Sequence, residues 1–201
     1  MKRIIVAMSG ASGAIYGVRA LQVLQAVPEV ETHLILSPSA RRTIVEETPW
    51  SVAEVEALAG VVHAHRDIGA SISSGSFRTA GMLVAPCSIK SLSGIVHSYN
   101  DNLLARAADV CLKERRTLVL LVRETPLHLG HLELLAQAAR YGAVILPPVP
   151  AFYNRPRTIE DLVDHTVGRA LDQFDIPHRL VKRWKEPETA PEPVDRLARP
   201  A

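Results

Sequence analysis

Short apolar runs alternate with longer segments of helical periodicity along most of this chain. Runs rich in β-branched residues are typical of strands buried on both faces, and they cover residues 4–6, 32–36, 61–64, 81–85, 117–122 and 143–146. Between them apolar residues recur at helical spacing, which predicts helices that begin at residue 14 and cover residues 38–47, 51–58, 102–114, 128–141 and 159–174. This alternation predicts an α/β fold, a doubly wound parallel sheet of the Rossmann or flavodoxin-like type in a single domain.

Local signals refine this assignment at three places in the chain. Ser37 followed by Pro38 suits the N-cap and the first position of a helix, so the helix over residues 38–47 begins there. Residues 68–77 are small and hydroxyl-rich without sustained periodicity, which indicates a long loop that is either functional or disordered. Residues 117–122 are so apolar that we expect a central strand.

The first apolar run is followed by a turn of small residues, Ser9-Gly-Ala-Ser-Gly13, and then by helical periodicity. A strand, a glycine turn and a helix N-terminus present free backbone N–H groups and the positive end of the helix dipole to an anion. The hydroxyls of Ser9 and Ser12 can bond a phosphate oxygen or cap the helix. An ordinary turn with a serine cap is the simpler interpretation. Two glycines and two serines are more than a cap requires, which favours a bound anion.

The glycine spacing narrows the choice of ligand. Dinucleotide-binding folds carry G-x-G-x-x-G and an acidic residue about 20 residues further on, whereas here the glycines are Gly10, Gly13 and Gly17, and the second strand ends at Ser37. NAD is therefore disfavoured, and a mononucleotide such as FMN fits better. A nucleophile elbow, G-x-S-x-G, does not fit either, because Gly13 directly follows Ser12.

Polar residues follow the predicted strands at their carboxyl ends. In a parallel doubly wound sheet these ends share one edge, where ligands bind at the point at which the strand order reverses. The segments concerned are Ser9–Ser12, Ser37, Pro86–Lys90, Arg123–Glu124 and the proline-rich loop that ends at Tyr153. We therefore expect the active site at this edge.

Cations near these strand ends and helix termini exceed the needs of one phosphate group. One phosphate is held by one or two cations together with backbone amides, so a surplus indicates a second phosphate; the cations are Lys90, Arg106, Lys113, Arg123 and Arg169. Solvated surface charge is the alternative, stronger for Lys113 than for Arg123, which directly follows a buried strand. Glu124 at the same strand end can serve as acid or base. Glu47 is a second candidate or a plain surface residue.

Cysteine, histidine and tyrosine side chains offer further chemistry. Cys87 lies in a turn after a strand, but no histidine is identifiable as its partner, so a small buried residue is favoured over a nucleophile. His128 and His131 are three residues apart without further ligands at recognisable spacing, and no metal site is expected. Tyr153 either packs in the core or covers a ligand, and the sequence leaves both open.

The composition is that of a globular protein. Of 201 residues, 47% are hydrophobic and 22% charged, and the formal net charge of +2 is too small to indicate a nucleic acid or an acidic membrane as partner. Two cysteines make no disulfide framework, and no apolar run approaches the ~20 residues of a membrane span. Without a signal-peptide pattern, we expect a cytoplasmic protein.

The chain after Trp184 is rich in proline and glutamate, so we expect a domain over residues 1–184 and a disordered tail over residues 185–201.

Five motifs, in order, resemble those of the flavin prenyltransferases, the family of UbiX and Pad1. They are Ser9-Gly-Ala-Ser-Gly-Ala-x-Tyr-Gly17, Pro86-Cys-Ser-x-Lys90, Arg106-Ala-Ala-Asp-Val-x-Leu-Lys-Glu-Arg-Arg116, Arg123-Glu-x-Pro126 and Pro150-x-Phe-Tyr153. The resemblance implies a flavin-binding, flavodoxin-like protein that joins a dimethylallyl group to N5 and C6 of reduced FMN. The donor would be dimethylallyl monophosphate, or the diphosphate as in some members, and no metal would be required. The product, prenylated FMN, would serve a UbiD-type decarboxylase.

The resemblance also implies roles for individual residues. FMN would be contacted by Gly10, Ala11, Ser12, Ser37, Ser88, Ile89, Lys90, Ser91 and Arg123. The prenyl phosphate would be contacted by Lys113, Glu124, Tyr153 and Arg169, with Ser74 and Arg106 nearby. The catalytic residues would be Glu124, Glu47, Ser12, Lys113 and Arg106, with Glu47 implicated in proton handling. Family members assemble as dodecamers with sites at subunit interfaces, so we expect a homo-oligomer in which a neighbouring subunit can supply Arg106 and Lys113.

These roles are chemically coherent, because ionising an allylic phosphate needs cations and an acid at the leaving group and an aromatic environment for the developing cation. Two other functions remain open. The chain could be an aromatic acid decarboxylase or a subunit of one, although no separate set of residues for a substrate carboxylate supports this. It could also be a non-catalytic flavin carrier, which would need neither Glu124 nor the surplus cations.

Overall fold

A computed structural model describes residues 1–181, so Trp184 and the expected tail over residues 185–201 lie outside the described part of the chain. Within residues 1–181, six parallel strands form one sheet in the order β3-β2-β1-β4-β5-β6. The strands are β1 (Lys2–Met8), β2 (Val30–Leu36), β3 (Val61–His63), β4 (Gly81–Cys87), β5 (Thr117–Val122) and β6 (Val144–Ile145). The chain builds outward from β1 to β3 and then crosses to β4 on the other side of β1, so the strand order reverses between β1 and β4.

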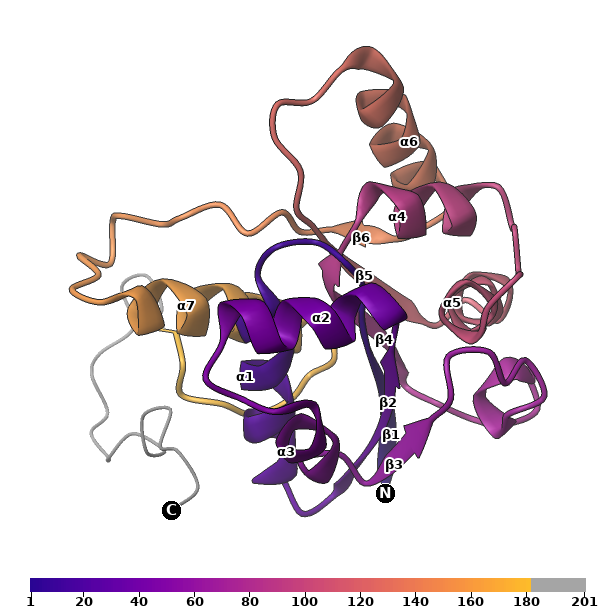
Figure 1. Cartoon of the computed structure of the whole chain (residues 1–201), viewed down its shortest axis with the longest axis horizontal. Helices are drawn as coiled ribbons and strands as arrows, with labels where there is room; N and C mark the ends of the chain where they lie inside the picture. The colour runs from indigo at the N-terminus through magenta and orange to yellow at the C-terminus, as the bar shows by residue number, and fades with distance from the viewer. Residues whose placement is uncertain (182–201) are drawn as a thin grey trace.

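Helices cover both faces of this sheet, as Figure 1 shows. They are α1 (Ala14–Gln25), α2 (Pro38–Glu47), α3 (Val52–Ala57), α4 (Ile89–Val96), α5 (Leu103–Lys113), α6 (Leu129–Arg140) and α7 (Ile159–Asp172), with a short 3-10 helix, η1 (Ser71–Ser73), in the crossover to β4. The predicted doubly wound parallel sheet is thereby confirmed.

Alternate residues of β1 point into two hydrophobic cores. Ile4, Val6 and Met8 pack with residues of α1, α2, α3 and α7, whereas Ile5 and Ala7 pack with residues of α4, α5 and α6. These five side chains are at most 1% exposed. A strand covered by helices on both faces needs apolar residues at successive positions, which is the pattern that predicted it.

The structure corrects two expectations about strands. The strand over residues 117–122, expected to be central, is β5, which lies between β4 and the edge strand β6. It is nevertheless buried along nearly its whole length, because β6 pairs with it and helices cover both of its faces. The last strand is also shorter than the apolar run 143–146 suggested, since only Val144 and Ile145 form β6.

The last helix, α7, is fixed to α1 by a buried ion pair. The guanidinium of Arg19, whose side chain is 4% exposed, donates two hydrogen bonds to the carboxylate of Asp164, at 2.6 and 3.1 Å. A planar guanidinium bound to both carboxylate oxygens fixes distance and orientation together.

In the described range 1–181, no helix has the length and apolar character that crossing a membrane requires.

Replacing Asp164 with Asn should destabilise the protein, because it leaves the buried Arg19 guanidinium without its carboxylate. Breaking a buried pair costs about 3–5 kcal/mol, and the partial exposure of Asp164 moderates this, so we expect the free energy of unfolding to fall by about 2–4 kcal/mol. Urea denaturation followed by circular dichroism measures the change. Glu46→Gln, which removes the exposed Arg42–Glu46 pair, is the control and should cost less than about 1 kcal/mol. Equal effects of the two substitutions would contradict this role of the buried pair.

Candidate active site

Backbone hydrogen bonds join the carboxyl ends of four strands at one edge of the sheet. The amide of Ser37 donates to the carbonyl of Met8 (3.0 Å), that of Ser9 to Pro86 (3.1 Å) and that of Arg123 to Cys87 (3.1 Å). These bonds continue the ladders of β2, β1, β4 and β5 by one residue past the strands. The first polar residues after these strands are therefore held along one rim.

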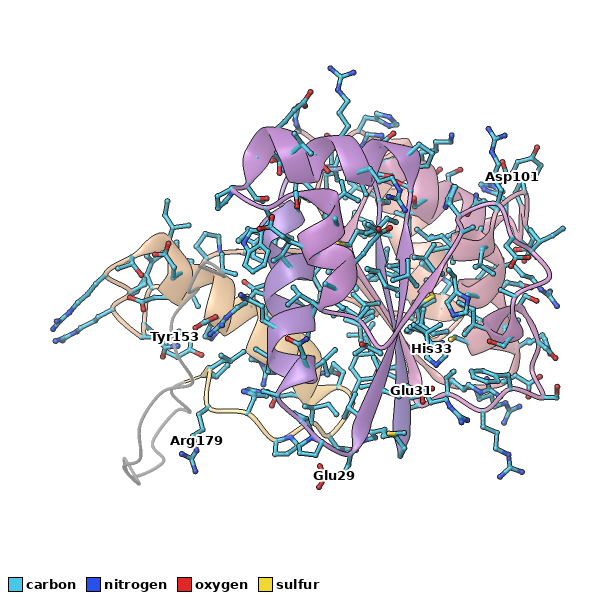
Figure 2. The ribbon with its side chains drawn as sticks, turned by 60° about the horizontal axis from the view of Figure 1, so that its bottom comes forward. Glu29, Glu31, His33, Asp101, Tyr153 and Arg179 are labelled. Atoms are coloured by element: carbon cyan, nitrogen blue, oxygen red, sulfur yellow. The ribbon has the colours of Figure 1, made fainter. Side chains whose placement is uncertain are left out.

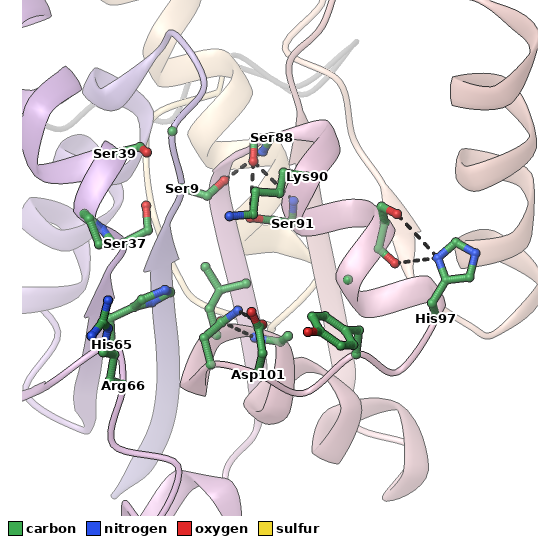
Figure 3. Close-up of a pocket in the computed structure, with 18 residues that line it drawn as sticks. Ser9, Ser37, Ser39, His65, Arg66, Ser88, Lys90, Ser91, His97 and Asp101 are labelled. Carbon is green, nitrogen blue, oxygen red and sulfur yellow. Dashed lines mark hydrogen bonds between the residues drawn. The ribbon is translucent and has the colours of Figure 1, made fainter.

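A cavity of about 830 Å³ opens at this rim, between the ends of β1, β2 and β4 and the beginnings of α2, α4 and α5 (Figure 3). Five residues that the resemblance implied as FMN contacts line it, namely Gly10, Ser37, Ser88, Lys90 and Ser91. Four others, Ala11, Ser12, Ile89 and Arg123, do not line this cavity in the single chain. The rim also contributes polar residues that the sequence did not suggest, among them Ser39, His65, Arg66 and Asp101.

Three helix N-termini meet at the cavity. The N-caps Ser37, Ser88 and Asn102 each accept the amide N–H three residues further on, at 3.0, 3.3 and 3.0 Å. Because the first turn of a helix leaves amides without intrahelical partners, the N–H groups of Ile89 and Lys90 remain available for a ligand. With the ammonium group of Lys90, they make this end of the cavity suitable for an anion.

The N-terminus of α1 is occupied differently from what the sequence suggested. A carboxylate oxygen of Glu47 accepts the amide N–H of Gly13 at 2.7 Å and that of Ala14 at 3.2 Å. The amides that were candidates for a phosphate therefore bind a carboxylate of the same chain. Glu47 is consequently not a plain surface residue, because it joins the end of α2 to the beginning of α1.

Neither serine of the first turn caps α1, so the serine-cap interpretation is wrong. The N-cap is Gly13, whose φ of 106° is left-handed and favours glycine. The hydroxyl of Ser9 instead donates to the carbonyl of Pro86 at 3.0 Å and accepts the amide of Ser88 at 2.7 Å. Ser12 lies exposed beside this turn.

His65 is the most informative residue that the sequence analysis missed. It follows β3, lines the cavity, and its Nδ1 is buried with no hydrogen-bond partner among the described residues. Burial lowers the pKa of His65, and the positive charges of Lys90 and Arg66 act in the same direction against the opposing charge of Asp101. Its place at the carboxyl end of a strand was the available signal, although β3 is short and only weakly apolar.

The strand end of β5 carries Arg123 and Glu124 as expected, both exposed. The backbone of Arg123 is fixed to β4 through Cys87, and a carboxylate oxygen of Glu124 accepts the amide of Thr125 at 3.0 Å. Both residues follow β5 at the expected edge of the sheet, and neither lines the cavity in the single chain.

Lys113, Arg106 and Ser74 lie away from this rim. Lys113 ends α5, four residues before β5 begins at Thr117, so it stands at the amino edge of the sheet, where its ammonium group pairs with Glu114. Arg106 donates to the carbonyl of Ser73 at 3.1 Å and pairs with Asp109 at 3.1 Å, which fixes the crossover to α5. Ser74 is exposed on the same crossover.

Tyr153 and Arg169 lie at a third place in the chain. Tyr153 belongs to the irregular segment 146–158 between β6 and α7, and Figure 2 shows it on the opposite side of the molecule from Asp101, which lines the cavity. Its side chain is 54% exposed, which excludes the core interpretation for this chain. Arg169 is exposed on α7 and pairs with Asp172 at 2.9 Å.

Cys87 is buried as the sequence favoured. Burial raises its pKa, and that of Cys111, to about 12, which is unsuitable for a nucleophile. His128 accepts the amide of Gly130 at 3.1 Å as the N-cap of α6, and its ring lies against that of His131, with 3.6 Å between centroids and a tilt of 35°. Residues 1–181 contain no group of three or more histidine, cysteine or acidic side chains arranged to hold a metal.

The fold and the rim define a class, the doubly wound α/β proteins that bind a ligand where the strand order reverses. The family model described as Flavoprotein matches residues 1–171. A flavin prenyltransferase UbiX of Salmonella typhimurium is 66% identical over 187 residues, which cover 92% of this chain and 99% of the relative. The chain therefore belongs to the flavoprotein family and, within it, to the flavin prenyltransferases of the UbiX type.

Two solved structures resemble the chain equally well in shape. One is AnUbiX (PadA1) in complex with FMN and dimethylallyl pyrophosphate, with a TM-score of 0.90 and 50% identity, covering 93% of this chain and 99% of that one. The other is described as a dodecameric FMN-dependent UbiX-like decarboxylase from Escherichia coli O157:H7. Its TM-score is 0.90 and its identity 52%, covering 92% of this chain and all of that one.

The two cysteines should be unreactive in the native protein. With a pKa of about 12, their thiolate fraction at pH 8 is about 10⁻⁴, and both thiols are buried. A thiol reagent such as Ellman's reagent should therefore modify neither within minutes in buffer and both promptly in guanidinium chloride. Rapid modification of one thiol in the native protein would contradict the assignment of Cys87 as a packing residue.

Proposed function

We propose that this protein is a flavin prenyltransferase that joins the dimethylallyl group of dimethylallyl monophosphate to reduced FMN. The observation that carries the proposal is the rim cavity, which is lined by five of the residues that the UbiX resemblance associates with FMN. High identity to flavin prenyltransferases over nearly the whole chain supports the same reaction. We assign this function to residues 1–184.

The cavity suits FMN in size and in chemistry. Small-molecule sites typically measure about 300–1,000 Å³, and this one measures about 830 Å³. The hydroxyls of Ser37, Ser39 and Ser91, the ammonium group of Lys90 and the free amides of α4 are donors for a phosphate or a ribityl chain. His65 also lines the cavity, although its unpartnered Nδ1 is itself buried.

We assign flavin binding to Gly10, Ala11, Ser12, Ser37, Ser88, Ile89, Lys90, Ser91 and Arg123. Reduced FMN, when bound, supplies the electron-rich N5 and C6 positions that take the dimethylallyl group. The residues around it hold it at the rim, and Glu47, fixed on the amides of α1, is suited to handle a proton at the edge of the first turn.

We assign the prenyl phosphate to Lys113, Arg169, Tyr153 and Glu124, with Ser74 and Arg106 nearby. The bond between the allylic carbon and the phosphate oxygen breaks, and phosphate leaves. Cations stabilise its charge, and a carboxyl group at Glu124 can protonate it. By the same resemblance, no metal is needed for this step.

These residues are dispersed over one chain, which supports a homo-oligomeric enzyme. Lys113 stands at the amino edge of the sheet and Tyr153 on the far side from the cavity, so we propose that neighbouring subunits supply them to a shared site. The similar structure described as dodecameric makes a dodecamer the expected assembly. We further propose a cytoplasmic location and delivery of the product to a UbiD-type decarboxylase.

An alternative function follows from the relative that is described as a decarboxylase. The protein would then remove a carboxyl group from an aromatic acid or assist a subunit that does so. No separate set of residues for a substrate carboxylate supports this, and the 66% identity to a flavin prenyltransferase makes the transferase the better-supported function. A non-catalytic flavin carrier would leave Glu124 without a role.

The direct test is anaerobic incubation of the purified protein with reduced FMN and dimethylallyl monophosphate. We expect a flavin product heavier by one dimethylallyl group, detected by mass spectrometry, and a parallel reaction with the diphosphate ranks the two donors. An unchanged flavin in both reactions would refute the transferase. A decarboxylase would instead release carbon dioxide from cinnamic or hydroxybenzoic acid without the prenyl donor.

Substitutions at the end of β5 should separate flavin binding from turnover. Arg123→Ala should weaken FMN binding by about tenfold, the loss of one charge-assisted hydrogen bond, as measured by fluorescence titration. Glu124→Gln should leave the FMN dissociation constant unchanged and lower kcat by about 10²-fold or more, because the amide cannot deliver a proton. Wild-type turnover in both variants would show that the assignment of these residues is wrong.

A further inference from the structure

The carboxylate of Asp109 on α5 accepts hydrogen bonds from three side chains. One oxygen accepts the hydroxyl of Ser98 at 3.1 Å. The other accepts the side-chain amide of Asn100 and the guanidinium of Arg106, each at 3.1 Å. An ionised carboxylate can only accept, so all three partners are donors. The side chains of Asp109 and Arg106 are 21% and 34% exposed, which makes this a partly buried pair.

Two of these donors belong to the loop between α4 and α5. Ser98 and Asn100 bond to the carboxylate, whereas the loop residues that flank and separate them line the cavity, namely His97, Tyr99 and Asp101. Figure 3 shows His97 and Asp101 at the wall of this cavity. One carboxylate on α5 therefore holds a loop that forms part of the wall of the proposed flavin site.

The third donor, Arg106, is held at two of its nitrogens. Its Nε donates to the carbonyl of Ser73 at 3.1 Å and its Nη1 donates to Asp109, which follows it by three positions and lies on the same face of α5. A guanidinium carries five N–H donors, and in the described part of the chain Nη2 has no hydrogen-bond partner. Ser73 directly precedes Ser74, which is assigned to the neighbourhood of the prenyl phosphate together with Arg106.

We propose that Asp109 is a positioning residue that holds the guanidinium of Arg106 in the orientation in which its free N–H groups bind the phosphate of the prenyl donor. This inference rests on the proposed function, which places Arg106 near that phosphate. A long side chain loses rotamer freedom when it binds a ligand, and a guanidinium already fixed by two hydrogen bonds has lost much of that freedom beforehand. The bonds from Ser98 and Asn100 fix the carboxylate itself.

Replacing Asp109 tests this role directly. Asp109→Ala leaves Arg106 with one of its two bonds, so kcat/KM for dimethylallyl monophosphate should fall about tenfold. Asp109→Asn can keep the geometry, because its carbonyl oxygen accepts from Arg106 and Asn100 while its NH₂ group donates to the hydroxyl of Ser98. This variant should retain at least about half of the wild-type kcat/KM. The FMN dissociation constant of each variant is measured first, so that all rates are taken at saturating reduced FMN.

A double-mutant cycle separates positioning from a general structural role. In the Arg106→Met background there is no guanidinium to orient, so adding Asp109→Ala should change kcat/KM less than about twofold. A structural effect of Asp109 that does not act through Arg106 would instead lower kcat/KM by the same factor in both backgrounds.

A milder variant and a matched control complete the set. Asn100→Ala leaves the ion pair in place and removes one of the bonds that orient the carboxylate, so kcat/KM should fall about two- to threefold. Glu56→Ala removes a carboxylate of similar exposure, 29%, that pairs with Arg41 at 2.5 Å. Glu56 is assigned no role in the site, and this control should behave as wild type.

The results distinguish this inference from the proposed function. Wild-type kcat/KM in Asp109→Ala, an equal loss with and without Arg106, or an Asp109→Asn variant as impaired as Asp109→Ala would each overturn the inference while the wild-type protein still prenylates FMN. A gain of kcat/KM would overturn it too, because Asp109 would then withhold the cation from the phosphate. Absence of prenylated flavin with the wild-type protein would refute the proposed function and this inference with it. Circular dichroism of each variant confirms that the protein is folded.

Discussion

The joint between β1 and β4 is the constraint on which the candidate site depends. There, Ser9 donates its backbone N–H and its hydroxyl to the carbonyl of Pro86 and accepts the amide of Ser88. The strand order reverses at this joint, so α1 leaves it toward one face of the sheet and α4 toward the other. The segments that follow β1 and β4 diverge, and the cavity opens between them. The three hydrogen bonds of the buried Ser9 hold the two strand ends together beneath this cavity.

The glycines of the first turn serve this joint more directly than they serve a ligand. A Cβ on Gly10 would lie 2.2 Å from Cβ of Ser39, so a side chain there would push α2 away from the rim. A Cβ on Gly17 would lie 2.3 Å from the carbonyl oxygen of Ala85, so a side chain there would separate α1 from β4. With Gly13 supplying the left-handed turn, this glycine pattern brings two helices and two strands to the same point. Phosphate-binding glycines and packing glycines are thus not distinguishable by spacing alone.

Hydrogen bonds between residues close in the chain could be predicted from the sequence. Those whose two partners are far apart in the chain could not. Ser37 was identified as an N-cap because its acceptor role is completed three residues later. The same reasoning failed for Ser9, whose partners lie about 80 residues away, and for Glu47, whose partners lie more than 30 residues earlier. Apolar periodicity likewise reports burial and not position in the sheet, which explains why β5 seemed central. The flavin-associated residues that line the cavity were reachable because they lie in motifs of the resemblance or shortly after a strand, whereas the buried Nδ1 of His65 is revealed only by the structure.

The residues assigned to catalysis lie far apart in one chain, so the proposed active site depends on the assembly of subunits. Tyr153 lies on a segment whose neighbours Val149 and Phe152 are 70% and 71% exposed, and Ile159 at the start of α7 is 73% exposed. Exposed apolar side chains grouped in this way favour contact with another protein surface. A neighbouring copy that buries Phe152 must also fix the position of Tyr153, because the two residues are adjacent in the chain.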